Sequence, residues 1–447
     1  MEKACKKRDK MRPKKINNSQ SDLFKNRLSE ELNPKHELRQ LSTLIPWENL
    51  EEEFSEIYAD NGVGGQPPKP VRLIVGLLLL QHMHNLSDEN VVRMWVENPY
   101  WQYFCGYDYL QWTVPINPSS LTRWRGRLGK EKLEKILAMT VSVAVSSGTI
   151  KKKDLKSVTV DTTVMPKNIA YPTDSKLLER SRARLVKLAK KYGIELRQNY
   201  NRVCKKLTRQ IGGYLHAKQM KRASKSIKKL KTILGRVQRD ISRKIAGEES
   251  LQKIFASELS KAKSLLNRKK KDKNKLYSLH EEDVVCISKG KAHKRYEFGC
   301  KVSLSIANSG PGIITGSEAL AGNPYDGHTL AAALSLSEKI SGVTPSAAFI
   351  DKGYKGHKCE TPRVFISGQR RGVTAAIRKK LNRRQAIEPH IGHMKNEGKL
   401  GLSRLKGFAG DQANAILVAA SYNLKLILNH LRVCFVYFLY PIYDGIF

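Results

Sequence analysis

Three carboxylates of this 447-residue chain have a sequence context that favours a shared metal site. Asp161 lies in the β-branched run 157–164 and Asp351 ends the short apolar run 346–351, so both are expected in or at the end of strands. Glu388 lies further along, in a segment expected to be helical. Three carboxylates on a sheet and an adjacent helix can hold two Mg²⁺ ions about 3.5–4 Å apart, which activate a water or a 3′-OH and stabilise the leaving oxygen. Taken singly, each aspartate is more often a strand-end cap or turn residue, and only the set of three favours chemistry.

Other polar and aromatic residues are weaker candidates. Asp326 and His328 lie in a Gly-rich turn, where a structural role is favoured over assistance near the sheet. His390 and His393 are three residues apart, but no further His or Cys cluster supports a metal site, which favours a surface position. Tyr354 follows the second aspartate and could either stack on a distorted base or pack in the core.

The elements that must position these residues predict an α/β fold with a mixed sheet flanked by helices. A single strand comes first, and a long helical insertion separates it from the remaining elements. The remaining pattern predicts β-β-α-β-β-α, with strands at 296–306, 312–320, 346–351 and 373–377, a helix ending near 340, and helices from about 384 and from 411.

The segment before the first strand reads as helical. Ser87 precedes an apolar-periodic stretch and is expected to cap a helix. Another helix is predicted from Pro118, and it carries Arg123 and Arg125. A turn followed by a cationic helix resembles a helix-turn-helix, in which such side chains would contact DNA. A core helix with a solvated basic face is an equally good interpretation.

Charge dominates the composition. The chain has 81 Lys and Arg against 41 Asp and Glu, a net charge of +40, while hydrophobic residues make up 40% and argue against a disordered polycation. Such an excess favours a polyanionic partner, with nucleic acid first and an anionic membrane surface second. Roughly thirty Lys and Arg fall between residues 176 and 275, around an apolar stripe that runs from Ile227 to Ile245. This pattern predicts an antiparallel helical insertion that tracks phosphates, with Gly212, Gly213 and Gly247 punctuating it.

The remaining features concern the compartment and the domain boundaries. Seven scattered cysteines without a C-x-x-C pair fit a reducing cytoplasm, and no signal-peptide pattern follows Met1. The apolar run 433–447 is shorter than a membrane span needs, so a packed or frayed end is expected and no membrane partner. The expected domains are a basic flexible arm at 1–44, a helical DNA-binding domain at 45–148, a catalytic domain at 149–175 and 284–432, a basic helical insertion at 176–283, and an apolar tail at 433–447.

A family resemblance is carried by the spacing of Arg384, Glu388 and Lys395. This spacing is similar to the R-E-K part of the Tyr-Arg-Glu-Lys signature of DDE transposases of bacterial insertion sequences, in the insertion sequence four/five superfamily. Further segments resemble that family in the same order: 77–106, 160–163, 288–291, 322–328 and 350–354.

The resemblance implies an RNase H-like catalytic core that cleaves DNA at the ends of the element and joins the freed 3′-OH to target DNA. Asp161, Asp351 and Glu388 would hold two Mg²⁺ ions, for which Mn²⁺ could substitute, and Arg384 and Lys395 would contact phosphates. Two features depart from the pattern. Leu381 stands where the signature has tyrosine. Pro389 predicts that the helix begins near Glu388, which leaves open whether Arg384 shares its face.

Partners and rival functions follow from the same reading. The double-stranded partners would be the terminal inverted repeats and the target, held by a homodimer because two ends must be joined, at the nucleoid of a bacterial cytoplasm. One rival is a catalytically inactive, sequence-specific DNA-binding protein derived from a transposase. Another is an RNase H-like nuclease without joining activity. The repeat sequence, the target site and the second-strand chemistry are not readable from the chain.

Overall fold

The chain divides into two compact units. In the computed structural model the described residues are 26–55, 69–269, 272, 275–288 and 295–443. Unit 1 comprises residues 1–166 and 300–447, and unit 2 comprises residues 167–299. The expected loop motif at 288–291 lies mostly outside the described residues, as do the first 25 residues of the expected arm.

The first half of unit 1 is helical. Two segments expected in the flexible arm, Leu28–Glu31 and Glu37–Leu44, are in fact helices, because Leu28, Leu38 and Leu41 are buried. The arm expected at 1–44 is therefore wrong for these residues. The helices are α2 (Leu28–Glu31), α3 (Glu37–Leu44), α4 (Trp47–Glu53), α5 (Val71–Met83), α6 (Asp88–Glu97), α7 (Pro99–Phe104) and α8 (Ser119–Ser146).

Local sequence explains where two of these helices begin and bend. Ser87 caps α6 as expected, since its hydroxyl accepts a hydrogen bond from the Asn90 amide at 3.1 Å. Helix α8 starts near Pro118 as expected, but it is interrupted at Gly129, whose φ of 64° is accessible mainly to glycine. Aromatic side chains of this region pack in the core, with Trp95 and Trp101 buried.

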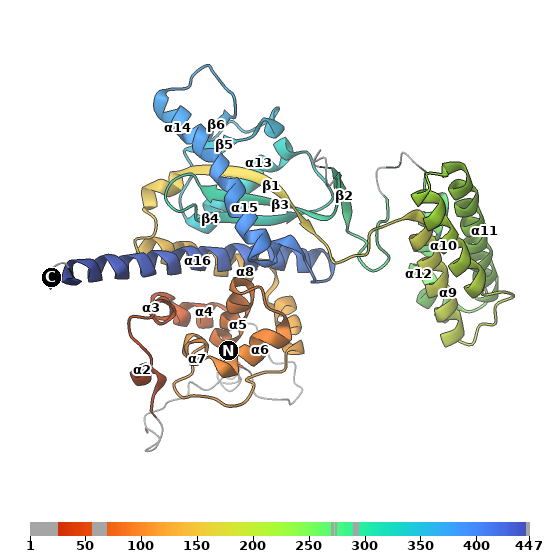
Figure 1. The fold of residues 1–447 in the computed structure, drawn as a ribbon, viewed down its shortest axis with the longest axis horizontal. Coiled ribbons are helices and arrows are strands. Elements are labelled where there is room, and N and C mark those ends of the chain that lie inside the picture. Colours follow the sequence, from red (N-terminus) through yellow and green to blue (C-terminus); the bar gives the residue numbers. More distant parts are fainter. Residues whose placement is uncertain (1–25, 56–68, 270–271, 273–274, 289–294, 444–447) are drawn as a thin grey trace, which may run out of the picture. The chain divides into compact units, whose positions relative to one another are not determined.

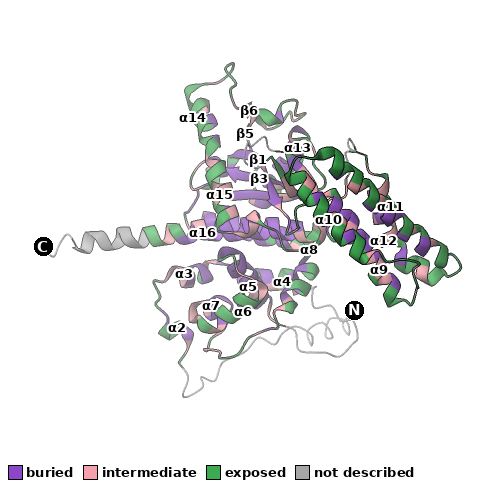
Figure 2. Cartoon of the chain, turned by 45° about the vertical axis from the view of Figure 1, so that its right-hand side comes forward, coloured by how far each residue is buried: buried purple, intermediate pink, exposed green. Residues whose placement is uncertain are grey.

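Helix α16 (Gly407–Tyr443) joins the helical half of unit 1 to its sheet (Figure 1). The Ser421 hydroxyl donates to the Leu79 carbonyl of α5 at 3.0 Å. The Asn423 side chain reaches Thr140 of α8 at 3.1 Å and bonds both the amide and the carbonyl of Ile314. Buried residues line α16 where it passes the sheet (Figure 2). A continuous apolar core therefore runs from the N-terminal helices to the sheet.

The sheet is mixed, in agreement with the predicted fold class. Strand β1 (Ser157–Pro166) lies between β3 (Tyr296–Ala307) and β5 (Ala347–Ile350), and β6 (Arg363–Ile366) follows β5. Strand β4 (Ile314–Leu320) pairs antiparallel with β3, as does the short β2 (Val285–Ser288) with the first residues of β3. Strands β1, β5 and β6 are parallel, in register.

Helices cover both faces of the parallel strands. On one face α13 (Asp326–Ser341) buries Leu330 and Leu334 against Val158 and Val160. On the other face α14 (Ala375–Arg383) contributes Leu381 to a cluster with Phe349 and Phe365. Because side chains alternate along a strand, Asp161 points away from the face that α13 covers.

One predicted strand is wrong. Residues 373–377 were expected as a strand, but the chain turns at Gly372 (φ 70°), Thr374 caps the helix by accepting from the Ile377 amide, and α14 follows. The last strand of the sheet is β6, four residues long, which the sequence pattern did not reveal. The run after Thr374 is rich in Ala, Arg, Lys and Leu, which favour a helix over an exposed strand.

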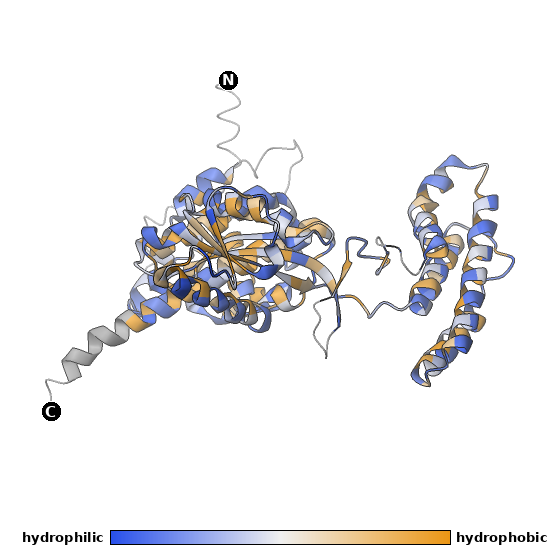
Figure 3. Ribbon diagram, turned by 90° about the horizontal axis from the view of Figure 1, so that it is seen from above, coloured by the Kyte–Doolittle hydropathy of each residue, from blue (hydrophilic) through white to orange (hydrophobic). Residues whose placement is uncertain are grey.

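In its described residues unit 2 is a bundle of four helices: α9 (Asp174–Lys191), α10 (Asn201–His216), α11 (Met220–Lys244) and α12 (Glu249–Asn267). The predicted stripe is confirmed, since Leu230, Leu234, Val237 and Ile241 of α11 are buried in the bundle core. Figure 3 shows hydrophobic and hydrophilic residues alternating around these helices. Gly212 and Gly213 were expected to interrupt the helical segment, but they do not. They lie within α10, and the turn follows at residues 217–219.

The apolar end of the chain continues α16 as far as Tyr443. Val433 is exposed, so of the two expected states, packed or frayed, this first residue of the run is not packed. In the part of the chain that the structure describes, no helix is long and apolar enough to span a membrane.

Candidate active site

Asp161 and Asp351 come together because two parallel strands pair in register. Val160 of β1 is the register partner of Ile350 of β5, so the two aspartates follow paired residues. Parallel strands bring their carboxyl ends to the same edge, and the two carboxylates therefore share that edge. Asp161 is half-buried, and the Asp351 side chain is 49% exposed. Both positions agree with the prediction from sequence, since Asp161 lies within β1 and Asp351 directly follows β5.

Tyr354 lies beneath this edge and is a core residue. It belongs to the short 3₁₀ turn Lys352–Tyr354, and its side chain is buried against Val160 and Ile350. Burial raises the pKa of its hydroxyl, and the Asp161, Asp326 and Asp351 carboxylates raise it further. Tyr354 therefore stays neutral and cannot offer its ring to a base, which decides between the two roles considered from sequence.

Asp326 is the third carboxylate at this end of the sheet, and two partners hold it. Its Oδ1 lies 3.0 Å from the Thr162 hydroxyl and 2.6 Å from Lys301 Nζ. Lys301 is almost completely buried in β3 and also donates to the Pro324 carbonyl at 2.8 Å. Asp326 is therefore fixed at this edge of the sheet by both partners, and its role is more than that of a turn residue.

Lys301 was missed by the sequence reading. A signal for it exists, since it is a lysine at a position of an alternating strand that should be buried. A buried lysine needs a charged or hydrogen-bonding partner, so its presence pointed to a carboxylate nearby. Which carboxylate it contacts depends on the packing of α13 against the sheet.

Arg384 reaches Asp351 from the opposite side. It lies in the 3₁₀ turn Arg384–Ala386, and its Nη2 is 3.5 Å from Asp351 Oδ1. Its side chain is 8% exposed, and its Nε is buried without a hydrogen-bond partner among the described residues. The guanidinium is therefore placed beside the carboxylate, whereas the sequence expected it to meet DNA phosphates.

Glu388 and Lys395 lie on α15 (Ile387–Asn396), which packs against β1. The helix begins one residue before Glu388, so Arg384 precedes the helix and does not share its face. Glu388 is exposed and makes no hydrogen bond or ion pair with the described residues, while Lys395 is half-buried in the last turn. A separation of seven positions is two helical turns, which puts both side chains on one face.

The donor chemistry of this edge fits a hard cation only in part. Asp161 and Asp351 offer carboxylate oxygens that water and phosphate can reach, and Mg²⁺ is often held by one or two carboxylates with the rest supplied by water and substrate. Within the described ranges, however, no group of three or more His, Cys, Asp or Glu side chains is placed to hold a metal ion. Glu388 is accordingly not gathered with the two aspartates into a preformed triad.

The remaining candidates on α14 and α15 have structural partners. The His390 Nδ1 lies 2.7 Å from the Tyr422 hydroxyl, and burial, His393 and Arg383 lower the pKa of His390. His393 faces Glu397 instead. Leu381, at the position of the signature tyrosine, is a buried apolar residue, so that position has no stacking surface.

The two arginines expected to contact DNA from α8 differ sharply. Arg123 is exposed, and its guanidinium donates to the Ser120 hydroxyl at 3.3 Å. The Arg125 side chain is 6% exposed and pairs with Asp88 through two bonds of 2.5 and 3.0 Å. The expectation for Arg125 is therefore corrected: a charge committed to a buried pair is not available to a phosphate without breaking the pair.

Comparison with known proteins identifies the class of this chain. Residues 26–127, which contain α2 to α7 and the start of α8, match the family model described as Transposase domain (DUF772). The chain belongs to the transposase family, which assigns it a transposition-related function and DNA binding in general.

A relative is known from Rhizobium meliloti. The chain is 46% identical over 209 residues to its uncharacterized protein ORF8 in the nfe locus, a match that covers 47% of this chain and 100% of the relative. No solved structure matches the chain.

Proposed function

We propose that the protein is a DDE transposase that cuts DNA at the ends of an insertion sequence and joins the freed 3′-OH to target DNA. The observation that carries this proposal is the in-register pairing of β1 with β5, which brings Asp161 and Asp351 to one edge in a chain of the transposase family. The mixed sheet, with an antiparallel hairpin on one side of β1 and two parallel strands on the other, supports an RNase H-like core.

The carboxylates would hold the metal. Asp161 and Asp351 supply hard oxygen ligands, and Glu388 is the proposed third ligand, on the helix that packs against β1. Bound Mg²⁺, or Mn²⁺ in its place, would activate the attacking water or 3′-OH and stabilise the leaving oxygen.

The other side chains at the edge position the aspartates. Lys301 neutralises Asp326, which holds the Thr162 hydroxyl next to Asp161. Arg384 orients the Asp351 carboxylate and limits the negative charge that would otherwise repel a phosphate. The apolar residues around the neutral Tyr354 side chain exclude water from the region beneath Asp161 and Asp351.

DNA would be held by cations that solvent can reach, one of them exposed and one half-buried. Arg123 on α8 and Lys395 on α15 are the proposed phosphate contacts of unit 1, and Arg125 supports the first of these helices from inside. The cationic helices of unit 2 would add sequence-independent affinity. Since two ends must be cut and joined together, a homodimer on the DNA is expected.

The test uses full-length protein, Mg²⁺ and a plasmid that carries the DNA flanking the gene, with new 3′ ends and joined products mapped by sequencing. Asp351→Asn should abolish cutting and joining while specific binding of the flanking DNA is retained. Asp283→Asn, at an exposed aspartate of unit 2, is the matched control and should behave as the parent.

Other outcomes would support the rivals. Specific binding with no cutting by the parent in Mg²⁺ or Mn²⁺ would identify an inactive DNA-binding protein derived from a transposase. Cutting that ignores the flanking repeats and gives no joined product would identify a nuclease.

A further inference from the structure

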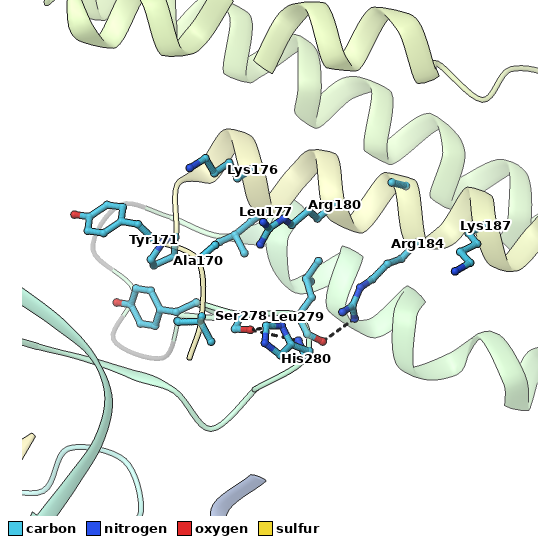
Figure 4. Close-up of a pocket in the computed structure, with 14 residues that line it drawn as sticks. Ala170, Tyr171, Lys176, Leu177, Arg180, Arg184, Lys187, Ser278, Leu279 and His280 are labelled. Atoms are coloured by element: carbon cyan, nitrogen blue, oxygen red, sulfur yellow. Dashed lines mark hydrogen bonds between the residues drawn. The ribbon is translucent and has the colours of Figure 1, made fainter. Parts of the chain in front are cut away.

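A pocket of about 330 Å³ opens within unit 2 (Figure 4). One wall is α9 from Lys176 to Lys187, and the others are the segment 169–172 before that helix and the segment 277–280 after α12. Its volume is at the lower end of the range typical of small-ligand sites, which suits a single nucleotide and is too small for a duplex.

A row of cations lines the α9 wall. Figure 4 shows Lys176, Arg180, Arg184 and Lys187 along this helix. Their spacing of four, four and three residues puts them on one face, about 6 Å apart along the axis for each step of four. This is close to the distance between successive phosphates of an extended strand.

Three of these cations are available to a ligand. Lys176, Arg180 and Lys187 are exposed, and their side chains have no hydrogen-bond or ion-pair partner among the described residues. Arg184 is different, because it donates to the Leu279 carbonyl at 2.9 Å and pairs with Glu258 at 3.3 Å. Arg184 thus holds the far wall to α9, and the others leave uncompensated positive charge at the opening.

An aromatic ring stands beside this row. Tyr171 is 61% exposed, yet its ring is held edge-on by Phe298, with 5.3 Å between centroids. Phe298 is in turn packed against Tyr277, another residue of the pocket wall. The Tyr171 ring is therefore oriented by packing while it remains open to solvent, as a stacking surface requires.

We propose that this pocket binds single-stranded DNA, with a base stacked on Tyr171 and the following phosphates on Lys176, Arg180 and Lys187. An aromatic platform beside a cationic track is the arrangement that binds single strands without sequence preference. An acidic peptide would use the cations but has no need of the exposed ring. The choice of DNA rests on the proposed function, since cutting and joining exposes single-stranded ends.

Binding is tested with the full-length protein in EDTA, which prevents cutting, by the fluorescence anisotropy of a labelled dodecathymidylate across a series of KCl concentrations. Tyr171→Ala should weaken binding on the order of tenfold, and Tyr171→Phe should retain the parent affinity. The plot of log K against log salt has a negative slope. Arg180→Ala combined with Lys187→Ala should make this slope shallower by about 1.4, because two phosphate contacts are lost.

Control variants distinguish binding in the pocket from general attraction of DNA to the positive charge of unit 2. Lys225→Ala combined with Lys229→Ala removes two exposed lysines of α11 that do not line the pocket. This control should change affinity much less than the pocket variant does, and an iododeoxyuridine oligonucleotide should crosslink to Tyr171. Circular dichroism of each variant checks that unit 2 remains folded.

Three results would overturn the proposal. The first is an unchanged affinity in Tyr171→Ala, and the second is an equal loss of affinity in the pocket double variant and in the α11 control double variant. The third is competition by an oligoglutamate that is as effective as competition by an oligonucleotide of the same charge. The last would identify an acidic-peptide site. Asp351→Asn should bind the oligonucleotide normally, so a failure of the catalytic proposal would be seen separately.

Discussion

Replacement of Arg125 by methionine tests whether this arginine supports the fold or contacts DNA. The Asp88–Arg125 pair joins the start of α6 to α8, and Gln81 of α5 hydrogen-bonds both partners. Burial alone would raise the pKa of Asp88, but hydrogen bonds from Arg125 and Gln81 hold it below its ordinary value. Asp88 is therefore ionised at neutral pH and needs its partner.

The expected cost can be worked from this geometry. Removing one partner of a buried ion pair typically destabilises by about 3–5 kcal/mol, because the other charge is left uncompensated. The Asp88 side chain is 21% exposed and keeps Gln81, so we expect a loss of about 2–4 kcal/mol for Arg125→Met. Asp88→Leu combined with Arg125→Met should recover most of this loss, since it removes both charges.

The assay is urea unfolding followed by tryptophan fluorescence. All five tryptophans lie between residues 47 and 124, so the signal reports on the helical half of unit 1. Arg125→Met should lower the midpoint by about 1 M, whereas Arg123→Met at the exposed neighbour should leave it unchanged. If Arg125→Met left the midpoint unchanged and weakened DNA binding more than Arg123→Met, the reasoning would be refuted and Arg125 would be a DNA contact.

Two further predictions follow from buried polar groups. Lys301→Met should leave Asp326 without its cation and reduce DNA cutting on the order of 10- to 100-fold, with DNA binding retained. The reason is that the reaction slows when groups at the active edge are misplaced. Equal cutting by parent and variant in the plasmid assay would contradict this prediction. His82 of α5 is completely buried, and burial together with Lys399 lowers its pKa to about 3, so it is neutral when folded. The unfolded state protonates at about 6.5, which means that stability should fall as the pH is lowered from 6.5 towards 3, by about 3 kcal/mol at pH 4. His82→Gln should make the free energy of unfolding less dependent on pH, as measured by urea unfolding at pH 7 and pH 4.5. If the variant showed the same pH dependence as the parent, His82 would not be its cause.

Much of the fold could be anticipated from local patterns. The β-branched run around Asp161, the Ser87 cap and the apolar stripe of α11 each specify their element through neighbours a few residues away, and the structure has all three. The patterns failed where a short segment was ambiguous. Residues 373–377 read as a strand, yet the Thr374 cap and the helix formers that follow it make α14.

The candidate site divides along the same line. Residue types and spacing by themselves singled out Asp161, Asp351 and Glu388 as candidate metal ligands, and the excess of Lys and Arg favoured a polyanionic partner. Only the tertiary structure decided that Asp161 and Asp351 share an edge while Glu388 remains apart from them, that Lys301 holds Asp326, and that Arg125 is buried. The physical reason is that a charge acts through its solvation and its nearest opposite charge, and both are set by segments distant in the chain.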